Sequence, residues 1–303
     1  MSEDASDEVV SRHVPVLLSA VLEYLAPQPG QIIADVTVGA GGHAQAIAQR
    51  LGPTGTLLAL DQDPTMLALA QRRNYFCRVY WCHARFEDLP AVLAERSLQA
   101  LDGVLADLGF SSDQLADPQR GFSFLQEGPL DMRLDPTSNR PTAADLLAQL
   151  SEHELADIVR RYGQERFSRR IARRIVQIRQ RQPLRTTVQL AELVRSCVPR
   201  SGRIDPATRT FQALRIAVND ELGALRRFLE VLPQCLRPGG RAVIISFHSL
   251  EDRLVKQAFR QREIWLVLTK KPVRPGSAEI RANPRARSAR LRAAQLLPTQ
   301  RKP

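Results

Sequence analysis

The sequence has few cysteines, and no apolar run in it is long enough to cross a bilayer. In a chain of 303 residues, a disulfide scaffold is excluded by a total of only four cysteines, which are Cys77, Cys82, Cys197 and Cys235. The first ten residues are acidic and lack the basic and apolar segments of a secretory signal, so we expect none. These absences predict a soluble cytoplasmic protein with reduced thiols and no membrane association.

Lysine is also scarce, and the charge is unevenly distributed. Of the 43 basic residues, 39 are arginine. Residues 1–110 carry 7 basic against 13 acidic residues, whereas residues 160–215 carry 15 against 3 and residues 270–303 carry 10 against 1. Arginine pairs with phosphate and stacks on bases, so the two basic segments predict surfaces that hold the phosphates of a nucleic acid. A solvated basic face without a partner is the alternative.

Short apolar runs alternate with helical patterns at both ends of the sequence. Strands are predicted at 31–36, 56–61, 77–83, 101–107, 241–247 and 264–269, and helices at 44–51, 64–73, 87–96, 218–236 and 250–261. Strands that alternate with helices are typical of a doubly wound parallel sheet. The expected fold class is therefore α/β.

The alternation stops between about residues 113 and 210, where only helical or irregular patterns occur. Helices are predicted there at 142–149, 152–162, 165–181 and 186–197. We therefore predict one α/β domain, formed by residues 1–112 and 211–303, that is interrupted by an all-helical insertion over residues 113–210. The segment after residue 270 is rich in arginine and proline, and we expect part of it to be flexible until it binds a partner.

A glycine-rich turn and two acidic residues indicate a ligand site. The turn, residues 37–43, follows the first predicted strand, and glycine there lets the backbone approach a ligand closely. Asp61 ends the second strand, 20 residues beyond Gly41, where a carboxylate can accept both hydroxyls of a ribose. Asp107 ends the fourth strand. Ligands of open α/β sheets bind at the carboxyl ends of the strands, so these features are expected to converge.

Three interpretations of the glycine turn are open. Gly39, Gly41 and Ala44 fit the dinucleotide fingerprint, and the turn could also be purely structural. An S-adenosylmethionine site is favoured, because Asp35 lies at the end of the first strand and a Leu-Arg-Pro-Gly-Gly-Arg segment precedes the fifth. Both features are typical of methyltransferases.

The cysteines offer neither a metal site nor a nucleophile. Cys77, Cys82 and His83 lack the second ligand pair of a structural zinc site, so no metal is expected. Methylation of a pyrimidine at carbon 5 needs a thiolate that adds to the ring. None of the cysteines lies in a Pro-Cys turn or after a catalytic strand, which favours a nitrogen or oxygen acceptor.

Two further segments have both a functional and a structural interpretation. Phe247 and His248 follow the fifth strand, where they could stack on a base and position polar groups, or serve as a core residue and a helix cap. The predicted helix at 165–181 has apolar residues at core spacing, at positions 167, 171, 175 and 178. Its arginines cover the remaining surface and could contact RNA.

The chain resembles the RsmH (MraW) family of bacterial ribosomal RNA methyltransferases. The resemblance begins at His13 and runs almost to the C-terminus. Its motifs are TVGAGGH at 37–43, ADLG at 106–109 with Ser111 and Ser112, RGFSF at 120–124, GPLDMR at 128–133, YGQERF at 162–167, ATRTFQA at 207–213, ISFHSLEDR at 245–253 and NPRARS at 283–288.

The resemblance implies a class I (Rossmann-like) S-adenosylmethionine-dependent methyltransferase with a helical insertion. It implies a 16S rRNA (cytosine-N4)-methyltransferase that acts in the decoding, P-site region of the small ribosomal subunit. The implied cofactor contacts are Gly41, Gly42, His43, Asp61, Phe86, Asp107 and Gln114. Asp107 and His248 are the candidates for holding the hydrogens of the N4 amine. The candidate RNA contacts are Arg166, Arg169, Arg170, Arg173, Arg174, Arg209, Arg285 and Arg287.

Two rival classes of function stay open on the sequence. One is a methyltransferase of another RNA, DNA or protein acceptor, and the other is a non-catalytic, RNA-binding ribosome-assembly factor that keeps the fold. The oligomeric state is also open, with a homodimer as one option.

Overall fold

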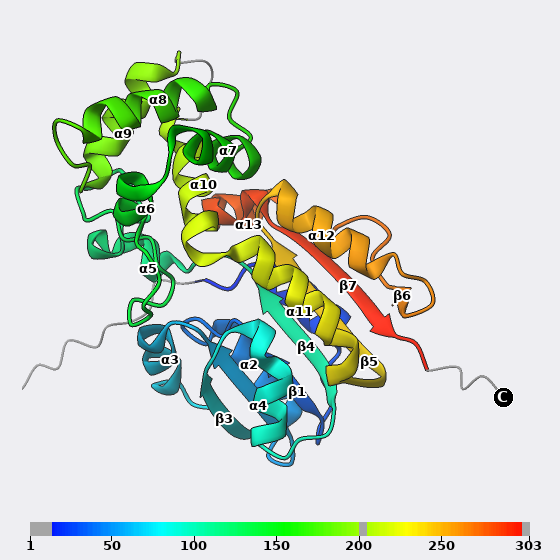
Figure 1. The fold of residues 1–303 in the computed structure, drawn as a ribbon. Coiled ribbons are helices and arrows are strands. Elements are labelled where there is room, and N and C mark those ends of the chain that lie inside the picture. Colours follow the sequence, from blue (N-terminus) through cyan, green and yellow to red (C-terminus); the bar gives the residue numbers. More distant parts are fainter. Residues whose placement is uncertain (1–13, 200–204, 299–303) are drawn as a thin grey trace, which may run out of the picture.

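The computed structural model describes residues 14–199 and 205–298, so His13 and the acidic segment before it lie outside the described residues. A seven-stranded sheet with the order β3-β2-β1-β4-β5-β7-β6 forms the body of the described part (Figure 1). Its strands are β1 (Ile32–Asp35), β2 (Thr56–Asp61), β3 (Arg78–His83), β4 (Leu101–Asp107), β5 (Leu236–Ser246), β6 (Trp265–Val267) and β7 (Arg290–Leu296). The first five strands are parallel, whereas β7 is antiparallel to both β5 and β6. The predicted doubly wound α/β sheet is thus confirmed.

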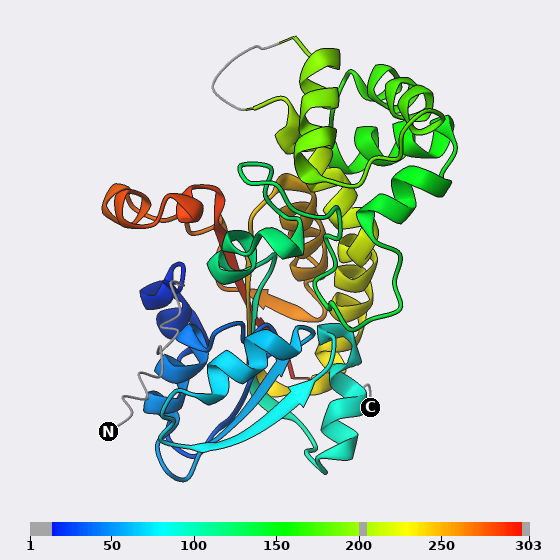
Figure 2. The ribbon, with the colours of Figure 1, turned by 90° about the vertical axis from the view of Figure 1, so that its left-hand side faces the viewer.

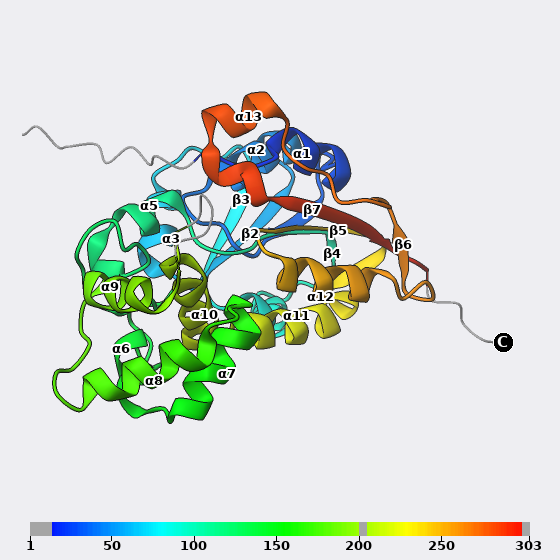
Figure 3. The same ribbon diagram turned by 90° about the horizontal axis from the view of Figure 1, so that it is seen from above.

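Helices cover both faces of the sheet, as Figure 3 shows from above. One apolar core includes side chains of α1 (Leu18–Leu25), α2 (Gly42–Leu51) and α3 (Pro64–Gln71). The other includes side chains of α4 (Leu89–Glu95), α11 (Glu221–Cys235) and α12 (Ser249–Phe259). Strand residues alternate between the two cores, with Ile33 in the first and Ala34 in the second. Fully buried parallel strands therefore account for the continuous apolar runs of the sequence.

A third core belongs to the helical insertion. It joins side chains of α6 (Ala143–Gln149), α7 (Glu152–Gly163), α8 (Ser168–Arg179), α9 (Thr187–Cys197) and α10 (Ala207–Asn219). Figure 2 shows α6 to α9 gathered at one end of the molecule, beyond the sheet. The sequence boundaries at 112/113 and 210/211 fall within helices, the first in α5 (Ser112–Ala116) and the second in α10. Phe211, Leu214 and Val218 on α10 still belong to the insertion's core.

Several elements were not predicted from the sequence. These are α1, α5, α10, α13 (Ser277–Ala282) and β7, together with the short 3-10 helices η2 (Pro118–Arg120) and η3 (Pro284–Ser288), whereas η1 (Phe86–Asp88) overlaps the helix predicted at 87–96. Within the segment after residue 270, residues 290–296 form β7, which lies inside the sheet, whereas the expectation that part of the segment is flexible stays a prediction. The buried Arg292 is neutralised there by Asp252, whose Oδ1 atom lies 2.6 Å from its Nε atom. None of the helices in the described ranges is both long and apolar enough to cross a membrane.

Candidate active site

The main cavity of the described residues lies at the carboxyl edge of the sheet. It has a volume of about 610 Å³ and is lined from the loops after β1, β2, β4 and β5, from the insertion and from η3. Of the residues predicted as cofactor contacts or catalytic groups, it brings together Gly42, His43, Asp61, Phe86, Asp107, Gln114 and His248. Gly41 does not line it. The predicted convergence of the strand ends on one site is therefore confirmed, because parallel strands end at the same edge.

Asp61 is tied to the glycine turn. Its Oδ2 atom accepts a hydrogen bond from the backbone N–H of Gly39 at 2.7 Å, and its Oδ1 atom accepts one from the N–H of Asp63 at 2.9 Å. Burial raises the pKa of Asp61 to about 6, although these two bonds favour the charged form. The carboxylate is thus held at the cavity wall in a fixed orientation.

The glycines of the turn have different reasons to be glycine. Gly41 has a φ of +84°, and a Cβ atom there would lie 2.4 Å from the Tyr75 hydroxyl. A Cβ atom on Gly42 would lie 3.0 Å from Pro15. Gly41 therefore allows the left-handed backbone of the turn and its close packing against Tyr75, on the side away from the cavity. The residue that both lines the cavity and bonds to Asp61 is Gly39, which the sequence singled out only through the dinucleotide fingerprint.

Acidic groups and a histidine gather beneath the turn. Asp35 is 1% exposed, and burial raises its pKa to about 7, which His43 partly offsets. The Nε2 atom of His43 lies 3.5 Å from Oδ2 of Asp107. Asp35 Oδ2, Asp107 Oδ1 and both ring nitrogens of His43 have no hydrogen-bond partner among the described residues. Of these three residues, His43 and Asp107 line the cavity. Buried polar atoms are normally paired, so the unpaired atoms of these two residues indicate a bound ligand.

These residues fit S-adenosylmethionine better than a dinucleotide. The cofactor carries a positively charged sulfur and an ammonium group, and three carboxylates at the ends of β1, β2 and β4 favour positive charge nearby. The Asp61 carboxylate can accept the hydroxyls of a ribose. The pyrophosphate of a dinucleotide would bring two negative charges to an acidic site.

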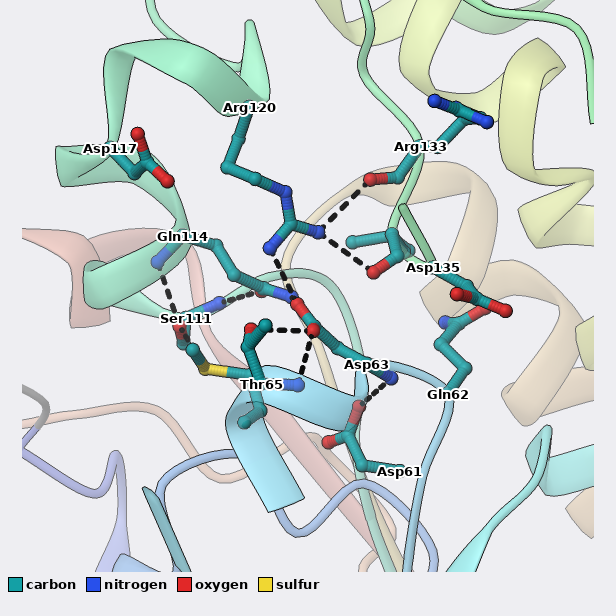
Figure 4. Close-up of polar contacts among 12 residues, drawn as sticks. Asp61, Gln62, Asp63, Thr65, Ser111, Gln114, Asp117, Arg120, Arg133 and Asp135 are labelled. Carbon is teal, nitrogen blue, oxygen red and sulfur yellow. Dashed lines mark hydrogen bonds and ion pairs between the residues drawn. The ribbon is translucent and has the colours of Figure 1, made fainter. Parts of the chain in front are cut away.

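Behind this wall, Asp63 is the centre of a buried polar cluster (Figure 4). Its carboxylate is 0% exposed and accepts hydrogen bonds from Thr65, from Gln114 Nε2 at 2.7 Å and from Arg120 Nη1 at 2.6 Å. Burial alone would raise the pKa of Asp63, but the Thr65 bond and the Arg120 charge hold it below its usual value. Asp63 is also the N-cap of α3, where its side chain accepts from the N–H of Thr65. The sequence did not predict its partners.

Gln114 and Phe86 are held in place by their neighbours. The Gln114 side chain completes a capping box with Ser111 at the start of α5, and its Oε1 atom accepts from the Ser111 N–H at 2.7 Å. Gln114 is thus oriented by Ser111 and Asp63 together. Phe86 packs edge-on against Phe228, with ring centroids 5.3 Å apart, and presents the remainder of its ring to the cavity.

His248 is the N-cap of α12, the structural alternative considered above. Its Nδ1 atom accepts from the N–H of Glu251, whose carboxylate in turn accepts from the N–H of Phe247 at 2.8 Å. The carboxylate also lies 3.2 Å from His248 Nε2. Burial alone would raise the pKa of Glu251, but His248 and Arg215 hold it below its usual value. His248 still lines the cavity.

Among the described residues, Glu221, His248 and Glu251 form the one group of potential metal ligands, with ligand atoms within 4.8 Å of one another. However, the two carboxylate oxygens of Glu221 accept hydrogen bonds from Arg215 at 2.7 and 2.8 Å. The group is therefore an ion-pair network, of which Arg215 and His248 line the cavity. Cys77 and Cys82 lie on or beside β3, and burial raises the pKa of Cys77 to about 11.

Aromatic side chains form the end of the cavity nearest the insertion. The rings of Phe110 and Phe122 stack with centroids 5.2 Å apart, and Phe124 packs against Phe211 at 4.8 Å. Phe122 and Phe124 thus both pack the insertion and line the cavity. Phe247 also lines the cavity.

The arginines predicted to contact RNA fall into two groups. Arg166, Arg169, Arg170, Arg173, Arg174, Arg209 and Arg287 are exposed. The apolar side of α8 is buried as the core spacing predicted, with Ile171 and Ile175 0% exposed. Arg285 differs, because its side chain is half-buried in the wall of the cavity. A contact of Arg285 with RNA stays a prediction.

Comparison with known proteins gives a consistent family. The model of the MraW methylase family matches residues 10–297. A ribosomal RNA small subunit methyltransferase H of Thermomicrobium roseum is 49% identical over 97% of this chain and 98% of its own length. The protein of that name from Acidobacterium capsulatum is 50% identical over 94% and 98%. Among solved structures, an rRNA methylase from Streptococcus thermophilus has a TM-score of 0.42 at 9% identity and covers 93% of this chain and 94% of its own.

Proposed function

Because the chain belongs to the MraW methylase family, we propose that it methylates N4 of a cytidine in the decoding, P-site region of 16S rRNA. Its cofactor is S-adenosylmethionine, and it is a 16S rRNA (cytosine-N4)-methyltransferase. The observation that carries the proposal is the juxtaposition of Asp61, His43 and Asp107 in one cavity whose far end is lined by aromatic rings. The cavity can therefore hold the cofactor and a base together.

The cofactor end of the cavity is assigned to the loops after β1 and β2. We assign the ribose to Asp61, the adenine to Phe86, and the backbone approach to Gly39 and Gly42. Gln114 holds Asp63 and the start of α5, and through them the loop that carries Asp61. When bound, the cofactor would supply an electrophilic methyl group on a positively charged sulfur.

The acceptor end of the cavity has to activate a poor nucleophile. The lone pair of a cytosine N4 amine is delocalised into the ring, so an acceptor must hold its hydrogens and take one proton. Asp107 has the unpaired Oδ1 atom for this. The Nε2 atom of His43 lies 3.5 Å from the other carboxylate oxygen of Asp107. His248 is a positioning residue at this end, because its Nδ1 atom is used by the cap of α12. Most of the rate enhancement is then expected from orientation.

The basic surface of the insertion is assigned to the phosphates of the rRNA. The exposed arginines of α8 lie on the side of the helix opposite its buried isoleucines, and few acidic residues offset them. Such a surface attracts RNA through the release of counterions. A cytoplasmic location and a homodimer stay predictions.

The experiment is methyl transfer from labelled S-adenosylmethionine to unmodified small ribosomal subunits and, separately, to naked 16S rRNA, followed by digestion to nucleosides. Label in N4-methylcytidine supports the proposal, and the better substrate shows at which stage of assembly the enzyme acts. Label in another nucleoside, or in protein, overturns the acceptor. Absence of both transfer and cofactor binding would support the non-catalytic alternative.

A further inference from the structure

Two buried polar atoms of opposite hydrogen-bonding type are unpaired at the acceptor end of the cavity. Asp107 Oδ1 is an acceptor and Arg285 Nη1 is a donor, and neither has a partner among the described residues. Both side chains line the same cavity, and the Asp107 charge acts on the Arg285 guanidinium. An unsatisfied buried donor or acceptor is costly, so the pair indicates a ligand that carries the complementary groups.

The Arg285 side chain is fixed by contacts that engage Nη2 and leave Nη1 without a partner among the described residues. Its Nη2 atom donates to the backbone oxygen of Phe110 at 2.9 Å, and its guanidinium carbon lies 4.8 Å from the centre of the Phe110 ring. The same ring stacks on Phe122, and the guanidinium carbon of Arg215 lies 4.7 Å from its centre. Asn283, whose side chain accepts from the Arg285 N–H, anchors the start of η3. Such a held guanidinium can make directional hydrogen bonds at little entropic cost.

Cytosine and uracil differ at the atoms that such a pair contacts. Cytosine presents an amine donor at N4 and acceptors at N3 and O2, whereas uracil presents an acceptor at O4 and a donor at N3. A carboxylate beside N4 and a guanidinium beside N3 therefore match cytosine and oppose uracil. The two unpaired atoms supply one acceptor and one donor, as this edge requires.

We propose that Arg285 is a specificity-determining residue, which donates a hydrogen bond to N3 of the target cytosine while Asp107 accepts one from N4. This inference rests on the proposed N4 methylation and adds to it the residue that recognises the base. It changes the expected role of Arg285 from a phosphate contact to a contact with the base.

The test replaces one atom of the substrate and one side chain of the enzyme. Small subunits are assembled with 16S rRNA that carries either cytidine or 3-deazacytidine at the target position. The analogue keeps the N4 amine and O2 but has C–H in place of N3. For the wild type, kcat/KM is expected to fall about tenfold on the analogue, because one directed hydrogen bond to the base is removed. For Arg285→Met, kcat/KM is expected to fall about tenfold on cytidine and no further on the analogue.

Arg287→Met is the matched control, because Arg287 lies on the same short helix and is exposed. Removal of a phosphate-binding side chain lowers kcat/KM equally on both substrates, so its cytidine-to-analogue ratio is expected to equal that of the wild type. Arg285→Leu also lacks a donor and provides a second variant should Arg285→Met fail to fold. A wild-type ratio in either Arg285 variant, or no discrimination by the wild type, overturns the proposal. Failure of the wild type to form N4-methylcytidine on the natural substrate would instead overturn the proposed function.

Discussion

The carboxylate of Asp63 and the guanidinium of Arg120, 57 residues apart in sequence, meet at 2.6 Å with almost no exposure to solvent. Asp63 follows β2 and donates its own N–H to Asp61, the proposed ribose ligand. Arg120 lies in η2, and its Nη2 atom donates to the backbone oxygens of Arg133 and Leu134. The pair therefore connects the cofactor loop of the sheet to the first part of the insertion.

Loss of Arg120 is expected to destabilise the protein strongly. Arg120→Met leaves the Asp63 carboxylate buried without its cation, and removing one partner of a buried pair costs about 3–5 kcal/mol. The measurement is the free energy of unfolding in urea. Arg161→Met is the control, because its ion pair with Asp157 is solvent-exposed and such pairs contribute about 0–1 kcal/mol. Equal losses of stability in the two variants would contradict this role of the Asp63 cluster.

Asp35 is expected to reduce the stability of the cofactor-free protein at neutral pH. Its pKa is raised from 3.8 to about 7, so the folded state holds a proton that the unfolded state has lost. Below about pH 4 the carboxyl is protonated in both states and does not oppose folding. As the pH rises to 7, the free energy of unfolding therefore decreases. Asp35→Asn keeps the acceptor for the Thr37 N–H and removes the charge. We expect a gain of a few kcal/mol at pH 8 that disappears near pH 4.

Urea unfolding of both proteins across this pH range measures that gain. A difference that does not change with pH would show that the substitution acts through packing and not through the buried charge.

Cofactor affinity is expected to depend on pH through Asp61. The pKa of this carboxyl is about 6, and the charged form is the better acceptor for ribose hydroxyls. The affinity for S-adenosylmethionine should therefore fall as the pH decreases from 7.5 to 5.5, and Asp61→Asn should bind about tenfold more weakly at pH 7.5. Calorimetric titrations at several pH values measure this. Asp61→Asn should also lose the decrease below pH 6, and retention of the full decrease would assign it to another group.

The arginines of α8 are expected to set the salt dependence of RNA binding. Replacing Arg169, Arg170 and Arg174 with glutamine should weaken binding of 16S rRNA and lower the slope of log affinity against log salt by about one for each phosphate that is no longer neutralised. Filter binding at several salt concentrations measures both quantities. Arg260→Gln, at the end of α12 beside the loop to β6, is the control and should keep the wild-type slope. A slope unchanged in the triple variant would exclude α8 from the RNA interface.

The sequence predicted those parts of the site that follow from strand order alone. Asp61 and Asp107 end parallel strands, so their convergence needed no knowledge of packing. The N-cap role of Asp63 was also predictable, because an Asp-Pro pair is a local signal. Its pairing with Arg120 was not, since it depends on how the insertion folds back over the sheet.

Other parts of the fold could not be predicted because their arginines resemble surface residues. The arginines of β7 gave its sequence the appearance of a basic tail, and only the structure shows that Asp252 neutralises Arg292. The place of Arg285 in the cavity wall could not be predicted either, because nothing local indicates that its side chain contacts Phe110. Buried arginines can be identified from sequence only when their partners are known.

The position of the methyl group within the rRNA is the most direct test of the proposed function. Small subunits that lack the modification are incubated with labelled S-adenosylmethionine and either the wild type or Asp107→Asn, and nuclease fragments are analysed by mass. We predict one methyl group on N4 of a cytidine in the P-site region, and turnover about a hundredfold lower for Asp107→Asn. A methyl group elsewhere, or full turnover by Asp107→Asn, would contradict the proposed reaction.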